Sequence, residues 1–298
     1  MTLVRRAHPS RLPACLPGLA LLASIALVLP CTAAAEPKTP AAPAACTREP
    51  VGSGTVDRVV DGRTFMLADG RQVRLAGIEI PPLPQPNRAG PDAPPATGRP
   101  SENTGAAAAE ALRALVAGRE VVLMAAKSEA DRYGRLLADA ALKDHTEAGS
   151  IAKMLVSQGL ARVAGHPGTA ACRTELQAAE RAARAAKLGL WADPRYFPRA
   201  AEDVAGISAE RGQFTLVEGK VVSVRESGGT IYVNFGRRWS EDFTVTIAKR
   251  KARQFSSAGL DPRTLTGRHV MVRGWIEQRG GPWIEASAPE QIEIVADK

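Results

Sequence analysis

The stretch that most constrains the fold is residues 59–82, VVDGRTFMLADGRQVRLAGIEIPP, in which two Asp-Gly pairs divide short runs of alternating apolar residues. Asp-Gly is a typical turn between antiparallel strands, and the alternation places every second side chain on one face of a strand. Turns this closely spaced leave no room for a helix. The stretch therefore predicts a meander of tight hairpins that begins near Gly54.

The residues after the meander predict a domain that mixes strands and helices. Pro81 to Thr104 contains eight prolines and predicts a long surface loop without a regular element. Apolar periodicity beyond it predicts a short helix after Ser150 that runs into a strand, and a longer helix that Gly189 ends. That longer helix is predicted over 174–188, and the remaining predicted elements are helix 106–117 and strands 120–126 and 136–142.

A second group of strands is predicted near the C-terminus, at 214–224, 231–235, 243–247, 270–276 and 284–295, with a helix after the third. Five strands in this order are typical of an OB-type barrel. A weak internal repeat agrees, since Gly54-x-Val56-x-x-Val59 recurs as Gly219-x-Val221-x-x-Val224. The predicted class is therefore α+β, mainly β: a five-stranded OB-type barrel with three helices, followed by a second, smaller OB-like barrel.

The length of 298 residues favours two domains and a processed or disordered end. We expect a signal peptide over 1–35, a disordered Pro/Ala tail over 36–50, a first domain over 51–197, a linker over 198–212 and a second domain over 213–298. Three of the four tryptophans lie in the second domain.

The first 35 residues have the three parts of a secretory signal: an arginine-containing start, a short apolar stretch, and an Ala-x-Ala site that ends at Ala35. A lipid anchor at Cys31 is the alternative, which Pro30 fits poorly. We expect a periplasmic or secreted protein without a membrane span after cleavage. The segment contains three arginines and no acid. Its removal leaves 36 of the 39 Lys and Arg residues and all 31 Asp and Glu residues, which gives a mildly basic net charge of +5.

Two cysteines remain after that cleavage, Cys46 and Cys172. An exported chain meets an oxidising compartment, where an even pair most simply forms a disulfide. Metal binding lacks a Cys-x-x-Cys pair or a nearby histidine, and a catalytic thiol lacks a plausible base. The four histidines are scattered without zinc-site spacing.

Several motifs in one order resemble the thermonuclease family, also called staphylococcal-nuclease-like domains. They are GTVDRVVDGRTFMLADGRQVRLAGIEIPP, a helix, DRYGR, IAKMLVSQGLARV and a helix that ends AAKLGLW, over about residues 50–197. The resemblance implies a five-stranded OB-type barrel with three helices that hydrolyses DNA and RNA with calcium. It also implies two metal-binding Asp residues, a Glu that supports the attacking water, and two arginines that hold the phosphate.

Carried over by position, both arginines are present: Arg74 in QVRLAG and Arg135 in DRYGR, which the resemblance makes catalytic and phosphate-binding. Glu79 occupies the position of the second metal-binding Asp of the family pattern, and the first turn also carries an acid, Asp61. The first metal-binding Asp is replaced by Arg63 and the Glu by Pro82.

The two replacements oppose calcium binding. Calcium prefers several oxygen ligands, and a guanidinium beside the ion repels it by several kcal/mol, about 4 per unit charge at 4 Å and an effective dielectric of 20. We expect Arg63, Arg74 and Arg135 to bind a phosphate, the added guanidinium supplying charge that a metal supplies elsewhere in the family. The alternatives are an Arg63 that points into solvent, structural ion pairs at the other two arginines, and a replacement acid, Asp92 or Glu102, from the proline-rich loop.

The C-terminal unit has basic and aromatic side chains that suit single-stranded nucleic acid. The candidate contacts are Tyr232, Arg237, Arg238, Trp239, Lys249, Arg250 and Lys251. An ordinary solvated or packed surface, or a docking module for another envelope protein, remains an alternative.

Taken together, these patterns predict an exported protein that binds nucleic acid, DNA or RNA, or another phosphodiester, with weak or no hydrolysis. An active metal-dependent nuclease and a non-catalytic interaction module are the alternatives. Function depends on the site residues, so the fold alone does not decide among them.

Overall fold

The computed structural model describes residues 49–81, 100–124, 130–164, 170–238 and 240–295. All of them belong to one compact unit, Pro43–Lys298. Several sequence predictions concern residues outside these ranges: the signal peptide with Cys31, the tail up to residue 48, Cys46, Pro82, Asp92 and Trp239.

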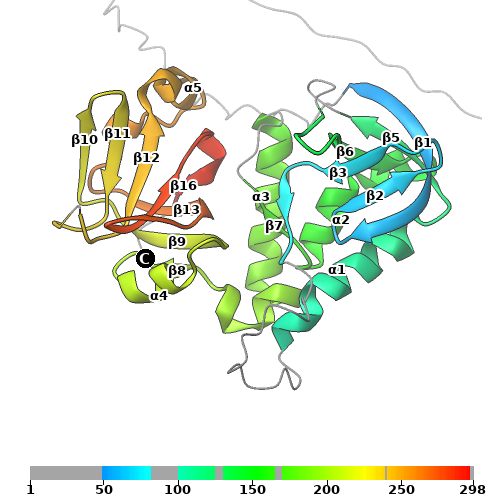
Figure 1. Ribbon diagram of the computed structural model, residues 1–298, viewed down its shortest axis with the longest axis horizontal. Coiled ribbons are helices and arrows are strands. Elements are labelled where there is room, and N and C mark those ends of the chain that lie inside the picture. Colours follow the sequence, from blue (N-terminus) through cyan, green and yellow to red (C-terminus); the bar gives the residue numbers. More distant parts are fainter. Residues whose placement is uncertain (1–48, 82–99, 125–129, 165–169, 239, 296–298) are drawn as a thin grey trace, which may run out of the picture. The chain divides into compact units, whose positions relative to one another are not determined.

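Five strands form a closed barrel, shown in blue to green in Figure 1. Its order is β1 (Pro50–Asp61), β2 (Thr64–Leu67), β3 (Gln72–Leu75), β6 (Leu136–Leu142) and β5 (Glu120–Met124), and β5 pairs again with β1. All neighbours are antiparallel except β3 and β6, which run parallel. This pairing order confirms the predicted OB-type fold.

The first Asp-Gly turn forms the predicted hairpin between β1 and β2, with Asp61 opposite Thr64. The Asp61 carboxylate accepts a hydrogen bond from the Arg63 backbone N–H at 2.9 Å, which fixes the turn. Between them, Gly62 faces the helix α1 (Pro100–Val116) so closely that a Cβ there would lie 2.8 Å from the Cβ of Ala108. The turn that carries Arg63 is thus held against a helix.

Three helices cover the barrel. The first, α1, begins at Pro100, although the sequence predicted a loop to Thr104; proline suits the first helical position because that N–H has no partner within the helix. Next is α2 (Ile151–Ser157), which Ser150 caps by accepting from the Lys153 N–H at 3.2 Å. The third is α3 (Ala170–Ala185), and all three place apolar side chains in the barrel core.

A two-stranded ribbon joins the end of the meander to the segment after α2. It pairs β4 (Ile78–Glu79) with β7 (Arg162–Val163), and Glu79 lies opposite Arg162. Both side chains are buried. The ribbon therefore places a carboxylate and a guanidinium opposite each other at the edge of the barrel core.

The C-terminal part contains two sheets. One has the order β10 (Ser223–Ser227), β11 (Thr230–Asn234), β12 (Thr244–Ala248), β15 (Gly281–Glu285) and β14 (Glu277–Arg279); the other has β16 (Ile292–Ile294), β13 (His269–Trp275), β9 (Phe214–Lys220) and β8 (Arg199–Ala200). Parallel pairing of β12 with β15 and antiparallel pairing of β13 with β9 repeat the pattern of the first barrel. Pairing between β13 and β15 is not among the ladders of the described strands, so a second closed barrel is not confirmed.

The predicted linker 198–212 contains β8 and a short helix, α4 (Val204–Ala209). Ala201 and Ile207 are buried in the core of the C-terminal sheets. The segment is thus part of that core, while the division into two domains stays a prediction. Other short helices are η1 (Lys143–Ala148), η2 (Gly189–Ala192), η3 (Pro194–Tyr196), η4 (Lys249–Lys251), α5 (Ala252–Ser257), η5 (Pro262–Thr264) and η6 (Pro289–Gln291).

The C-terminal sheets pack on α3 and the segment after it. Trp191 is buried with Phe214, Leu216 and Met271 in a small apolar cluster. Beside it, Arg273 of β13 forms an ion pair with Glu180 of α3. The strands 213–298 are therefore joined to the first barrel by a packed and charged contact.

Candidate functional site

The side chain of Arg63 points inward and not into solvent. Its guanidinium forms an ion pair with the Glu79 carboxylate, and Nη1 also donates to the backbone oxygen of Ile78 at 3.0 Å. Only 15% of the Arg63 side chain and 9% of the Glu79 side chain are exposed. The interpretation that Arg63 swings away from a disused turn is therefore wrong.

The partner of Arg63 is the acid that the family resemblance made a metal ligand. With its carboxylate bonded to a guanidinium, Glu79 has less capacity to coordinate calcium. Asp61, the other doubtful ligand, accepts the Arg63 N–H within its own turn. Within the described part of the chain, no group of three or more His, Cys, Asp or Glu residues has a metal-binding arrangement. The residues present do not fit a calcium site.

The side chain of Arg74 lies close to this pair. It is half-buried on β3, opposite Thr64. Burial lowers the pKa of its guanidinium, the positive charges of Arg63 and Arg135 lower it further, and the Glu79 carboxylate raises it. Its guanidinium has no hydrogen-bond or ion-pair partner among the described residues. Since arginine stays protonated in proteins, Arg74 presents an unpaired positive charge.

The third arginine, Arg135, is held by the turn that carries it. Its Nε donates to Asp131 Oδ2 at 2.8 Å, and its backbone N–H donates to Asp131 Oδ1 at 3.1 Å. Hydrogen bonding from Arg135 lowers the pKa of Asp131 to about 2. The guanidinium also lies 5.0 Å from the ring centre of Tyr133. The structure thus places the three predicted arginines near one another, but two of them have carboxylate partners.

Arg162 is a charged residue that sequence reasoning missed. It is buried, and its Nε has no hydrogen-bond partner. The guanidinium lies 5.7 Å from the ring centre of Tyr196 and 5.2 Å from that of Phe214. Burial lowers its pKa, which the charges of Glu79 and Glu180 oppose. The sequence LARV predicts only a short strand, and no pattern in it indicates that Arg162 is buried beside aromatic rings.

The predicted nucleic-acid contacts of the C-terminal unit are spread over several elements. Arg237 and Arg250 are exposed, Arg238 pairs with Glu241 at 3.2 Å and Lys249 with Glu226 at 3.0 Å. Lys251 donates to the backbone oxygen of Ser287 at 3.0 Å. Within the basic stretch KRKAR, Lys249 and Lys251 therefore make bonds to the rest of the fold, whereas Arg250 is exposed to solvent.

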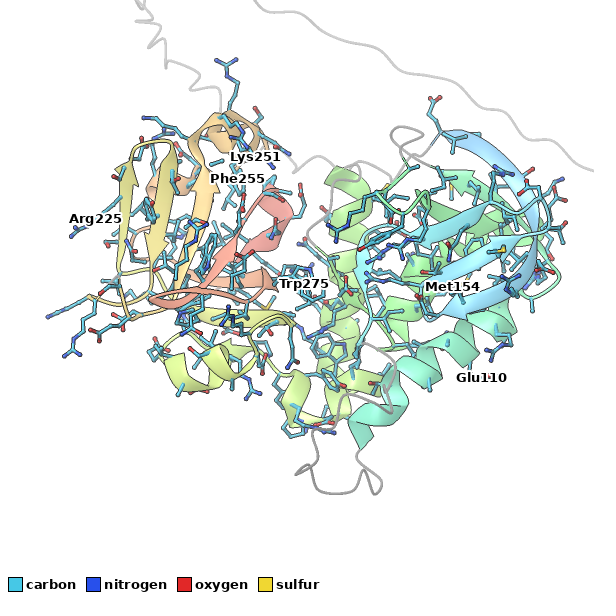
Figure 2. The ribbon with its side chains drawn as sticks, viewed as in Figure 1. Glu110, Met154, Arg225, Lys251, Phe255 and Trp275 are labelled. Carbon is cyan, nitrogen blue, oxygen red and sulfur yellow. The ribbon has the colours of Figure 1, made fainter. Side chains whose placement is uncertain are left out.

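Tyr232 and Arg237 are each near Arg225 in the fold. Arg225 of β10 is the cross-strand partner of Tyr232, and it points outward from the sheet (Figure 2). Arg225, Arg237, Ser223 and Asn234 line a shallow pocket of about 170 Å³. No acid lines it among the described residues, so Arg225 joins the predicted contacts.

Two further predictions, the disulfide and the absence of a membrane span, concern residues that are only partly described. Cys172 is buried in α3, whereas Cys46 lies outside the described ranges, so the disulfide stays a prediction. Over the described residues, no helix has the length and apolar character to cross a membrane.

Comparison with known families gives one match. Residues 72–193 match the model of the family described as staphylococcal nuclease homologue, whereas no curated protein matches the chain significantly. The matched residues begin in β3 and include Arg74, Glu79 and Arg135; the hairpin with Arg63 precedes them. Members of this family typically use calcium, which the arrangement around Glu79 does not fit. The chain therefore contains a staphylococcal-nuclease-like domain, a domain type of nucleases and nucleic-acid-binding proteins.

Proposed function

We propose that this protein binds nucleic acid, or another phosphodiester, at Arg74, with weak or no hydrolysis. The observation that carries the proposal is the difference between two neighbouring arginines. Arg63 is neutralised by Glu79, whereas Arg74 keeps an unpaired, half-buried guanidinium. A charge-assisted bidentate bond to a phosphate would satisfy it.

The neighbours of Arg74 support binding of an anion. Arg63 and Arg135 lower its pKa by repulsion, so a negative ligand would relieve an unfavourable interaction. Each of these two also has an acid partner that fixes its position. One unpaired charge implies modest, sequence-independent and salt-dependent affinity. The exposed Arg225 and Arg237 would extend the same interaction on the C-terminal sheets.

Weak hydrolysis follows from the chemistry of the same residues. The Glu79 carboxylate accepts a hydrogen bond from Arg63 and is neutralised by it, and Asp61 is bonded within its turn. The position of the family's water-supporting Glu holds Pro82, whose side chain cannot accept a proton. The alternative, an active metal-dependent nuclease, is favoured by the family match and requires acids from outside the described residues, such as Asp92.

The proposal also keeps the expected location, periplasmic or secreted, on the basis of the first 35 residues alone. In that setting, the remaining alternative is a non-catalytic module that binds another envelope protein. It differs from our proposal because it requires no affinity for nucleic acid and no dependence on salt.

The decisive experiment follows a labelled single-stranded oligonucleotide with purified protein, both for binding by anisotropy over a range of KCl and for cleavage with calcium, magnesium, manganese or EDTA. We expect binding without cleavage. Arg74→Gln should weaken binding and reduce the slope of log affinity against log salt by about one. Arg113→Gln is the matched control, since it removes the same charge from an exposed position on α1.

Other outcomes select the alternatives. Cleavage that requires a metal and is lost in Arg74→Gln would establish the nuclease and contradict our proposal. Absence of binding even at low salt would leave the interaction module.

A further inference from the structure

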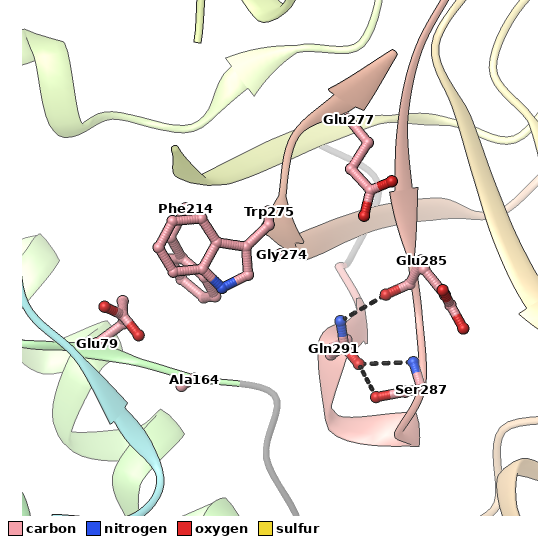
Figure 3. A pocket seen from close by; sticks show the side chains of 9 residues that line it. All are labelled: Glu79, Ala164, Phe214, Gly274, Trp275, Glu277, Glu285, Ser287 and Gln291. Atoms are coloured by element: carbon pink, nitrogen blue, oxygen red, sulfur yellow. Dashed lines mark hydrogen bonds between the residues drawn. The ribbon is translucent and has the colours of Figure 1, made fainter. Parts of the chain in front are cut away.

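A small cavity adjoins Glu79. Its volume is about 130 Å³, and its lining combines Glu79 with Phe214, Trp275, Glu277 and Glu285 (Figure 3). Pockets for drug-sized ligands have volumes of roughly 300 to 1,000 Å³, so this one suits a single ring system. The family match ends at residue 193 and therefore does not include most of this lining.

Trp275 is the prominent apolar side chain of the cavity. It ends strand β13, and 48% of it is exposed. Its indole meets the Phe214 ring edge to face, with centroids 6.2 Å apart and planes at 76°. Phe214 itself is buried and lies under the Arg162 guanidinium. The indole is thus supported from behind while much of its surface stays accessible to a ligand.

The charged groups that line the cavity are hydrogen-bond acceptors. Glu277 and Glu285 have exposed carboxylates that make no hydrogen bond or ion pair with other described residues. The nearby Gln291 amide is occupied, since Nε2 donates to the backbone oxygens of Arg273 and Glu285. Its Oε1 accepts from the Ser287 N–H at 2.7 Å. A phosphate would meet repulsion here, whereas a flat ring with amino groups would find a stacking surface and hydrogen-bond acceptors.

The cavity and the Arg74 site share one residue. The Glu79 carboxylate lines the cavity, pairs with Arg63 and acts electrostatically on Arg74. Glu79 therefore connects the two sites, and a nucleic acid held by a phosphate at Arg74 would have to extend past Glu79 to reach the cavity. We propose that the cavity receives an unpaired base of the nucleic acid whose phosphate binds at Arg74, stacked on Trp275, with its exocyclic amino group donating to Glu277 or Glu285.

This inference rests on the proposed function, and it adds a specificity. Cytosine and adenine carry an exocyclic amino group, whereas thymine carries none. Carboxylates accept from such amino groups, so C- and A-containing strands should bind more tightly than T-containing strands. A base inside a duplex is stacked and paired on both sides, so the cavity selects single strands.

The test measures affinities of oligo(dC), oligo(dT) and an abasic oligomer of equal length for the full protein. Wild type should bind oligo(dC) most tightly, oligo(dT) less tightly and the abasic oligomer most weakly. Trp275→Leu should bind dC about tenfold more weakly and leave the abasic oligomer unchanged, and Trp275→Phe should recover most of the loss. The double variant Glu277→Gln with Glu285→Gln should reduce the difference between dC and dT. Arg74→Gln should lower the affinity for all three oligomers.

Each other result has a defined meaning. If Trp275→Leu binds dC like wild type while Arg74→Gln binds it weakly, the base pocket is wrong and the proposed function stands. If Arg74→Gln also binds like wild type, the proposed function itself fails. Equal losses for dC and the abasic oligomer in Trp275→Leu would mean that Trp275 acts through the fold. Quenching of Trp275 emission by arginine amide but not by cytidine would make the cavity a cation site and overturn the inference.

Discussion

The guanidinium of Arg273 and the carboxylate of Glu180 form an ion pair at 2.7 Å in which neither side chain is exposed. The pair joins β13 to α3, and the backbone completes it: the Val163 N–H donates to Glu180 at 2.7 Å, and the Val163 oxygen accepts from Arg273 at 3.2 Å. Removal of one partner from such a pair leaves a buried charge without compensation, which costs far more than the pair itself contributes.

We therefore expect Arg273→Met to lower the free energy of unfolding by about 3 to 5 kcal/mol. The double variant Arg273→Met with Glu180→Gln should recover part of this loss, because the amide oxygen still accepts from Val163 and carries no charge. Urea denaturation of the two variants and wild type measures both values. A double variant less stable than Arg273→Met alone would contradict this account.

Replacement of Arg63 tests whether its guanidinium takes the place of a metal. Arg63→Asp removes the cation and adds a third carboxylate to those of Glu79 and Asp61, a set of oxygens that suits calcium. We expect millimolar calcium to raise the melting temperature of this variant and to leave wild type unchanged. Arg63→Gln is the control, since it removes the charge without adding an acid. An equal rise in wild type would show that calcium binds despite Arg63.

The turn of Arg135 predicts a dependence on pH. The pKa of Asp131 is about 2 in the folded chain against an ordinary value of 3.8, mainly because Arg135 donates a hydrogen bond to it. A lowered pKa contributes stability above pH 3.8, and this contribution is lost as the pH falls toward 2. NMR titration of the Asp131 carboxyl should give the low value in wild type and a higher value in Arg135→Gln, still below 3.8 because the backbone N–H groups of residues 133 and 135 also bond this carboxylate. A midpoint near 3.8 in both proteins would mean that the bond does not form in solution.

Gly62 should be required for the packing of the Arg63 hairpin on α1. A methyl group there would lie 2.8 Å from the Ala108 Cβ, and overpacking of this kind costs about 1 to 3 kcal/mol. Gly62→Ala should therefore destabilise the protein in thermal or urea unfolding. The added change Ala108→Gly should relieve only part of this, because Ile80 Cδ1 would still lie 3.0 Å from the new methyl group and glycine weakens a helix interior. Gly52→Ala, whose Cβ would lie 3.4 Å from Arg71 Nη1, is the control and should change stability little.

Local patterns predicted the first barrel well because its hairpins are specified by adjacent residues. Asp61 turns the chain through its own neighbours, and β6 begins and ends where the apolar pattern of residues 136–142 does. The start of α1 was missed because proline density was taken to exclude a helix, although proline suits the first turn. The segment 198–212 is polar in sequence, yet Ala201 and Ile207 within it are buried in the core of the C-terminal sheets.

The site was predicted in part. Family motifs identified Arg74, Arg135 and the replaced positions, but the pairing of Arg63 with Glu79 depends on where β4 lies in the folded chain. The same is true of Arg162, which is buried only because Phe214 and Tyr196 pack near it. The alternation of β13 does not reveal that the strand ends with a half-exposed Trp275 at a cavity.

The guanidinium of Arg63 is covalently part of the chain, and so every folded molecule carries one. A bound ion, in contrast, reaches a fraction of molecules that depends on its free concentration and its affinity. The pair between Arg63 and Glu79 would therefore make the state of this site independent of the mineral supply around the protein. Fluctuating calcium would then have no means to regulate it, and only the total ionic strength would tune how firmly an anion is held.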